Sequence, residues 1–86
     1  MKESKLTKTE QEFIKELELF DFDEYVSNRS TGDRFLLKPL GVALFDFIKG
    51  SEMLIANGNY KLVGKFDLAR DIFRKLYPDE YMGLLD

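Results

Sequence analysis

The densest group of side chains that could do chemistry is a cluster of carboxylates just after residue 20. Asp21, Asp23 and Glu24 stand almost side by side, and paired carboxylates can act as general acid and base or hold a cation. The cluster lacks the alternating oxygen ligands and the central glycine of a calcium loop. Because acidic residues also favour the first turn of a helix, the sequence predicts that these three cap a short helix. We therefore expect no catalytic residue and no metal site here.

The residue types that enzymes use most often as nucleophile or base are missing. The chain has no histidine and no cysteine, so these duties would fall to carboxylates, lysine or tyrosine, and no Cys or His zinc site can form. The spacing of the glycines matches neither a phosphate-binding loop nor a dinucleotide fingerprint. They stand at positions 32, 41, 50, 58, 64 and 83. The sequence thus predicts a protein that is not an enzyme and needs no cofactor.

Length and composition limit the number of domains and the size of the core that can position a site. The 86 residues predict a single helical domain, 1–86, whose core is thin because a short chain buries a smaller share of its surface. A hydrophobic content of 44%, with eight phenylalanines and four tyrosines, is too high for a disordered chain. Residues 2–5 are polar and lead into a polar predicted helix, unlike a signal core, and charged residues interrupt the longest apolar stretch. We expect a cytoplasmic protein without a membrane span.

The longest predicted element is a helix from Pro39 to Ala56 that is apolar on nearly every side. Proline suits the first position of a helix, and one broad face gathers most of the apolar residues. Val42, Phe45 and Met53 lie on the other side, among charged residues. A helix that is apolar all round is covered on both sides, and in so short a chain we expect a second copy or a partner to supply that cover. We predict a homodimer with these three residues in its interface.

The other apolar spacings predict a mostly α fold, a compact bundle of four helices with a C-terminal turn. Overlapping capping boxes that start at Thr7 and Thr9 indicate where the first helix begins. The residue before Pro39 is disfavoured in helical dihedrals, which indicates an extended segment there. The predicted elements besides the long helix are a helix over 8–20, a short helix over 22–26, an extended segment near 34–38, a helix over 65–77 and a turn from residue 78.

The dipeptide Asn57-Gly58 leaves two interpretations open. Glycine suits the positive φ that ends many helices, and the helical periodicity that continues from Leu40 favours such an end. An Asn-Gly pair between two apolar runs is also the signal of a β-hairpin, which would cover residues 53–63.

Charge is distributed unevenly along the chain. Residues 8–24 hold seven acidic side chains against two lysines, a balance of −5, whereas residues 61–75 hold five basic side chains against two acidic ones, a balance of +3. Two interpretations remain. These residues are ordinary solvated helix faces, or the acidic N-terminal helix and the basic C-terminal helix are complementary, either between two copies arranged head to tail or between the two helices. Complementarity of this kind sets orientation and association rate more than affinity.

Arg29, Arg34 and Lys38 bracket a loop and an extended segment, a place where cations could contact phosphates. Residues 33–41, which read DRFLLKPLG, resemble the last wing strand of winged-helix regulators and the start of their C-terminal helix. The resemblance implies that wing arginines contact DNA and that the following helix dimerises. The short, acidic segment before residue 33 supplies no helix-turn-helix, and a net charge of −3 disfavours phosphate binding.

Residues 39–48 and 73–81 are similar to small uncharacterised proteins of tailed phages, which implies a phage or prophage origin. From the residues themselves we predict a small non-enzymatic protein-interaction or adaptor module that is homodimeric through its central helix and binds an unidentified protein partner. Two alternatives remain. One is a nucleic-acid-associated regulator with a wing-like loop, and the other is an acidic inhibitor that binds a basic protein.

Overall fold

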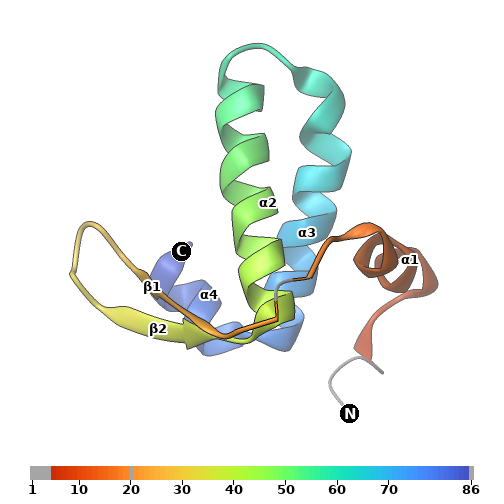
Figure 1. The fold of residues 1–86 in the computed structure, drawn as a ribbon. Helices are drawn as coiled ribbons and strands as arrows, with labels where there is room; N and C mark the ends of the chain where they lie inside the picture. Colours follow the sequence, from red (N-terminus) through yellow and green to blue (C-terminus); the bar gives the residue numbers. More distant parts are fainter. Residues whose placement is uncertain (1–4, 20, 86) are drawn as a thin grey trace.

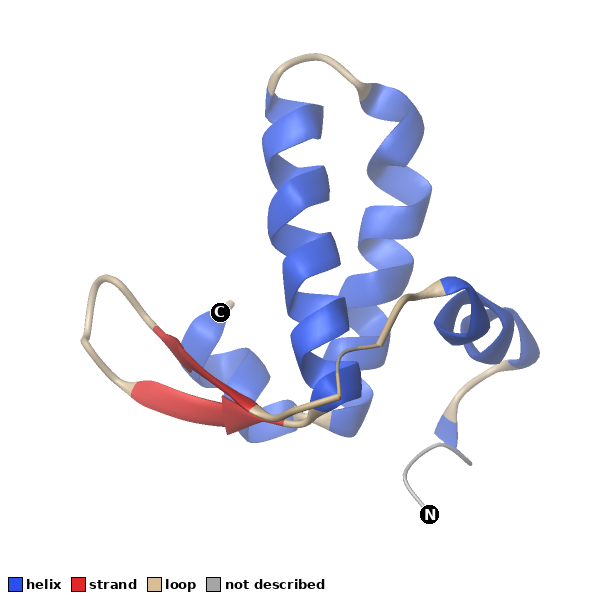
Figure 2. Ribbon diagram, viewed as in Figure 1, coloured by secondary structure: helices blue, strands red, loops and turns tan. Residues whose placement is uncertain are grey.

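The chain forms a helical hairpin with a small β-hairpin and two further helices packed around its base, as a computed structural model that describes residues 5–19 and 21–85 shows (Figure 1). Its elements are α1 (Lys8–Glu16), β1 (Glu24–Ser27), β2 (Arg34–Leu37), α2 (Pro39–Ala56), the short 3-10 helix η2 (Tyr60–Leu62), α3 (Val63–Leu76) and α4 (Pro78–Leu84). Helices dominate the described residues, which confirms the predicted mostly α fold (Figure 2).

The core lies between α2 and α3, which stand side by side and run in opposite directions (Figure 1). Each helix turns an apolar face toward the other, at the three- and four-residue spacing that places side chains on one side of a helix. The most deeply buried large side chains are Leu37, Val42, Leu44, Ile48, Ile72, Phe73 and Leu76. Burial of these side chains removes apolar surface from water, which is the main favourable contribution to folding.

The connection between α2 and α3 shows that Asn57-Gly58 ends a helix and does not form the turn of a β-hairpin. α2 continues to Ala56, Gly58 has a φ of 102°, and its N–H donates a hydrogen bond to the carbonyl oxygen of Ile55 (2.9 Å). Glycine adopts this left-handed conformation without the steric cost that a side chain brings. The helix end is confirmed, and a hairpin over residues 53–63 is wrong, because residues 53–56 complete α2 and a 3-10 turn leads directly into α3.

A β-hairpin stands where the sequence predicts a short helix over residues 22–26. β1 pairs antiparallel with β2, which places Val26 opposite Phe35 and Tyr25 opposite Leu36. The apolar spacing is compatible with a helix, but tyrosine and valine favour strands, and the pairing turns Val26 and Phe35 together onto the core. The short helix is therefore a wrong prediction, while the extended segment near 34–38 is confirmed as β2.

Asn28 holds the turn of the β-hairpin and ties it to α4. Its side-chain oxygen accepts hydrogen bonds from the backbone N–H groups of Ser30 (2.8 Å) and Thr31 (3.2 Å). Its side-chain amide donates to the carbonyl oxygen of Gly83 (2.6 Å). The ring of Phe35 lies so close to Gly83 that a Cβ atom there would overlap it. The approach of α4 to β2 therefore depends on a residue without a side chain.

α1 begins at the first of the two predicted capping boxes and ends earlier than expected. The Thr7 hydroxyl accepts from the N–H of Glu10 (3.1 Å), and the Glu10 carboxylate accepts from the N–H of Thr7 (2.8 Å). The helix ends at Glu16, and Leu17 is already extended, so a helix to Phe20 is wrong; Phe20 itself lies outside the described residues. More acidic residues follow, and negative charge is unfavourable at the C-terminus of a helix.

Replacing Gly83 with alanine is expected to destabilise the protein. The new methyl group would displace the ring of Phe35, and overpacking of this kind costs about 1–3 kcal/mol. Gly50→Ala is the matched control, because Gly50 lies inside α2 with open space around it, and alanine should stabilise the helix there by about 0.5–1 kcal/mol. Urea unfolding followed by circular dichroism measures both variants. An unchanged free energy of unfolding for Gly83→Ala would contradict the described packing.

Candidate functional site

The structure separates the three residues predicted to form an interface. Val42 is only 1% exposed and belongs to the core, so its place in an interface is a wrong prediction. The chain covers this end of α2 itself, where the helix follows β2 directly and packs on α3. Phe45 is half-buried, with its ring centroid 6.4 Å from that of Phe73. Met53 is 67% exposed, in the half of α2 that lies farther from the β-hairpin.

Phe45 and Met53 line a groove of about 800 Å³ on one side of α2. The turn of the β-hairpin and the C-terminal end of α4 supply its other walls. We call it the α2 groove, and its lining residues are Ser27, Asn28, Arg29, Ser30, Phe45, Lys49, Glu52, Met53, Ala56, Leu84 and Leu85. Apolar side chains from the helix and the chain end thus face polar ones from the hairpin turn, a combination typical of surfaces that bind other proteins.

Two cations and one carboxylate lie in the lining of the α2 groove. The Nζ atom of Lys49 is 3.8 Å from Oε1 of Glu52 and 5.8 Å from the ring centroid of Phe45. Arg29 is exposed in the hairpin turn and forms no ion pair with the residues that the structure describes. The lining has a formal charge of +1, because it contains two cations, Arg29 and Lys49, and one carboxylate, Glu52.

The three cations of the alternative nucleic-acid site all lie on the β-hairpin or at its end, but each is in a different setting. Arg34 lies over the ring of Tyr25, with its guanidinium carbon 4.5 Å from the ring centroid. Lys38 forms an ion pair with Asp23, at 3.0 Å between Nζ and Oδ2. Arg29 lines the α2 groove. Of the three cations, Lys38 is paired with a carboxylate and Arg34 with a ring, whereas Arg29 forms no ion pair with described residues.

The carboxylate cluster of Asp21, Asp23 and Glu24 caps no helix, because β1 begins at Glu24. That part of the prediction is wrong. All three residues are exposed, and Asp23 is engaged by Lys38. Among residues 5–19 and 21–85, no group of three or more carboxylates is placed to hold a metal ion.

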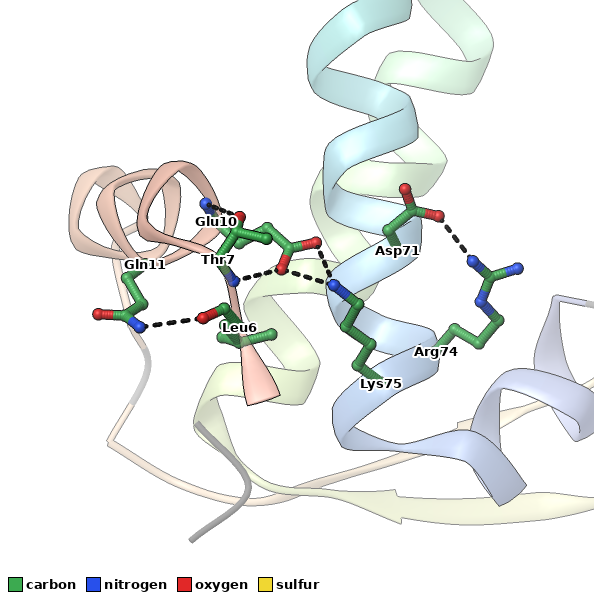
Figure 3. Close-up of polar contacts among 7 residues, drawn as sticks. All are labelled: Leu6, Thr7, Glu10, Gln11, Asp71, Arg74 and Lys75. Carbon is green, nitrogen blue, oxygen red and sulfur yellow. Dashed lines mark hydrogen bonds and ion pairs between the residues drawn. The ribbon is translucent and has the colours of Figure 1, made fainter. Parts of the chain in front are cut away.

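Glu10 is the one acidic residue that is buried among the described residues, and its carboxylate forms an ion pair with Lys75. Its two oxygens lie 2.8 and 3.0 Å from Nζ of Lys75, and one also accepts from the N–H of Thr7 (Figure 3). Burial alone would raise the pKa of Glu10. The hydrogen bonds from Lys75 and Thr7, with the charge of Lys75, outweigh burial and hold this pKa below its ordinary value of 4.5. The pair joins α1 to α3, so the contact between an acidic N-terminal and a basic C-terminal helix forms within one chain.

The sequence prediction misses most of the residues that surround Phe45 and Met53. Helical periodicity places Lys49 among the solvated residues, and nothing in the sequence brings the hairpin turn or the chain end to α2. The bond from Asn28 to Gly83 joins these two segments to each other across positions far apart in the chain. The spacing of Phe45, Lys49 and Met53, four residues apart on one helix, is the signal that could have placed Lys49 in the groove.

Comparison of the chain with models of protein families, with curated proteins and with solved structures found no match. The resemblances to winged-helix regulators and to small phage proteins therefore stay predictions. Within the residues that the structure describes, no helix combines the length and the apolar character needed to cross a membrane.

Replacing Glu10 with glutamine should weaken the fold near neutral pH and leave it unchanged in strong acid. Because the folded pKa of Glu10 is below its unfolded value, its stabilisation is present above about pH 4.5 and is lost as pH falls through the folded pKa. Loss of a charged, buried hydrogen-bond acceptor costs about 1.5–3 kcal/mol. Urea unfolding at a series of pH values tests this, with Glu12→Gln, an exposed change on the same helix, as control. A constant difference between Glu10→Gln and wild type at all pH values would contradict the account.

Proposed function

We propose that this chain is a small non-enzymatic protein-interaction module that forms a homodimer through the α2 groove. The observation that carries the proposal is that the side chain of Met53 is 67% exposed. It lies in an open groove that is also lined by the half-buried Phe45 and by Leu84 and Leu85 near the end of α4. Burial of one such side chain contributes about 1.5–3 kcal/mol. A second copy is the partner that is always present at the concentration of the chain itself, and symmetric homodimers are the commonest soluble oligomers.

The chemistry of the groove supports binding rather than catalysis. Its titratable lining consists of Arg29, Lys49 and Glu52, and the last two lie near each other at 3.8 Å. Glu10, whose surroundings do perturb its pKa, lies outside the groove lining and uses both carboxylate oxygens to hold α1 in place. A general base must lie within reach of a substrate, whereas the Glu10 carboxylate is buried and both of its oxygens accept hydrogen bonds from Lys75.

The nucleic-acid alternative receives less support from the same geometry. A phosphate-binding surface gathers several unpaired cations, whereas Lys38 is paired with Asp23 and Arg34 lies over Tyr25. The acidic-inhibitor alternative keeps one supporting feature, the exposed carboxylates between α1 and β1.

Replacing Met53 with glutamate should convert the dimer into a folded monomer. A buried charge in the interface would remove the apolar gain and weaken association at least about tenfold, since 1.4 kcal/mol corresponds to a factor of ten. Light scattering would give a mass near twice 10.1 kDa for the wild type and near 10.1 kDa for Met53→Glu. Circular dichroism checks that both are folded.

Met82→Glu is the matched control, because Met82 is also 67% exposed but does not line the α2 groove. It should leave the mass of the dimer unchanged. A wild-type chain that stays at 10.1 kDa at high concentration would overturn the proposed function. Equal effects of the two methionine changes would show that the groove is not the interface.

A further inference from the structure

One row of side chains on α2 runs along the α2 groove at the spacing that coiled-coil helices use. Phe45, Lys49, Glu52 and Ala56 follow one another at steps of four, three and four residues, and all four line the groove. Alternating steps of three and four keep side chains on one face of a helix, where a second helix can pack. We call these four residues the α2 stripe. Met53 flanks it beside Glu52.

We propose that the α2 stripe packs on the α2 stripe of a second copy, with the two helices antiparallel. The inference rests on the proposed homodimer and names the segment that fills its groove and the register in which that segment lies. A two-fold axis between positions 50 and 51 brings Lys49 opposite Glu52 of the second copy and Phe45 opposite its Ala56. Each contact therefore occurs twice, as a symmetric dimer requires.

The cover that the chain gives to one end of α2 sets the direction of the second helix. Continued toward the N-terminus of α2, the stripe reaches Val42, which is 1% exposed, whereas Lys49, Glu52 and Ala56 are exposed. The β-hairpin and α4 stand around the covered end (Figure 1). In a parallel pair the two covered ends would lie side by side and hold the helices apart. An antiparallel pair needs only residues 45–56 of each copy.

Charge is the second argument for this arrangement. Lys49 and Glu52 lie 3.8 Å apart between Nζ and Oε1, and their side chains remain 48% and 59% exposed. In the antiparallel register each lysine faces a glutamate of the other copy, so a stripe with one charge of each sign is complementary to itself. A parallel pair would place lysine against lysine and glutamate against glutamate. Like charges opposite each other are unfavourable at an interface, which favours the antiparallel pair.

The sizes of the apolar side chains are the third argument. The ring of Phe45 lies opposite the small side chain of Ala56, and large residues that face small ones allow two helices to interdigitate. The contact covers about 16 Å of each helix, at about 1.5 Å for each residue. Met53, beside the stripe, is then covered by the flank of the second helix. The hairpin turn and the end of α4 lie along the other side of this helix, since they form the remaining walls of the groove.

Disulfide cross-linking tests the register, because the chain has no cysteine of its own. Full-length Lys49→Cys and Glu52→Cys chains are oxidised separately and as an equal mixture, at a concentration where the wild type is dimeric. In a mixed dimer the two cysteines lie opposite each other. In each variant alone they are offset by about 4.5 Å along the helices, which disfavours a disulfide. A covalent product of twice 10.1 kDa should form at least about fivefold faster in the mixture.

Ala56→Cys tests the direction of the helices. Its two cysteines would face each other in a parallel pair, but they are about 16 Å apart along antiparallel helices. This variant should therefore cross-link no faster than Lys65→Cys and Asp67→Cys, the matched controls, which are exposed on α3 outside the groove lining.

Rapid cross-linking of Ala56→Cys alone would overturn the antiparallel contact. So would a mixture of Lys49→Cys and Glu52→Cys that reacts no faster than the separate variants. If Met53→Glu still converts the dimer into a monomer in either case, the proposed function stands and the inference alone has failed. A wild-type monomer would remove both.

Discussion

The packing of α2 on α3 is the constraint on which the rest of the structure depends. α2 is apolar on most of its surface, but α3 can cover one side of it. The β-hairpin and α4 pack around the base of this helical pair (Figure 1). α1 adds an edge-to-face contact between Phe13 and Phe47, with ring centroids 5.2 Å apart. The farther half of α2 receives no such cover, which leaves Met53 exposed. The candidate groove is thus a consequence of a long apolar helix in a short chain.

A second interaction shapes the groove once this core exists. Asn28 orders the hairpin turn and binds the carbonyl of Gly83, so the turn and the end of α4 are held together, and both line the groove beside α2. The contact of Phe35 with Gly83 fixes the distance between β2 and α4. Because one wall of the groove comes from the turn and another from α4, the same few atoms that stabilise the base of the fold also define its candidate binding surface.

The sequence predicted the features that depend on neighbouring residues. The capping box of Thr7 and Glu10, the start of α2 at Pro39 and its end before Gly58 all follow from local chemistry, and the structure confirms them. The strand at residues 24–27 was missed because its stability comes from pairing with β2, which the spacing along β1 does not encode. Val42 was misplaced for a related reason: nothing local shows which side of an all-apolar helix the chain itself will cover.

We propose above all that a second copy covers the outer side of α2 at Met53. NMR of chains labelled at the methionine methyl groups tests it most directly, because the described residues contain two methionines, Met53 and Met82, of equal exposure and different location. On dilution, the account predicts that the Met53 signal moves along a saturable curve while the Met82 signal stays in place. A Met53 signal that does not change with concentration, or equal movement of both signals, would contradict it.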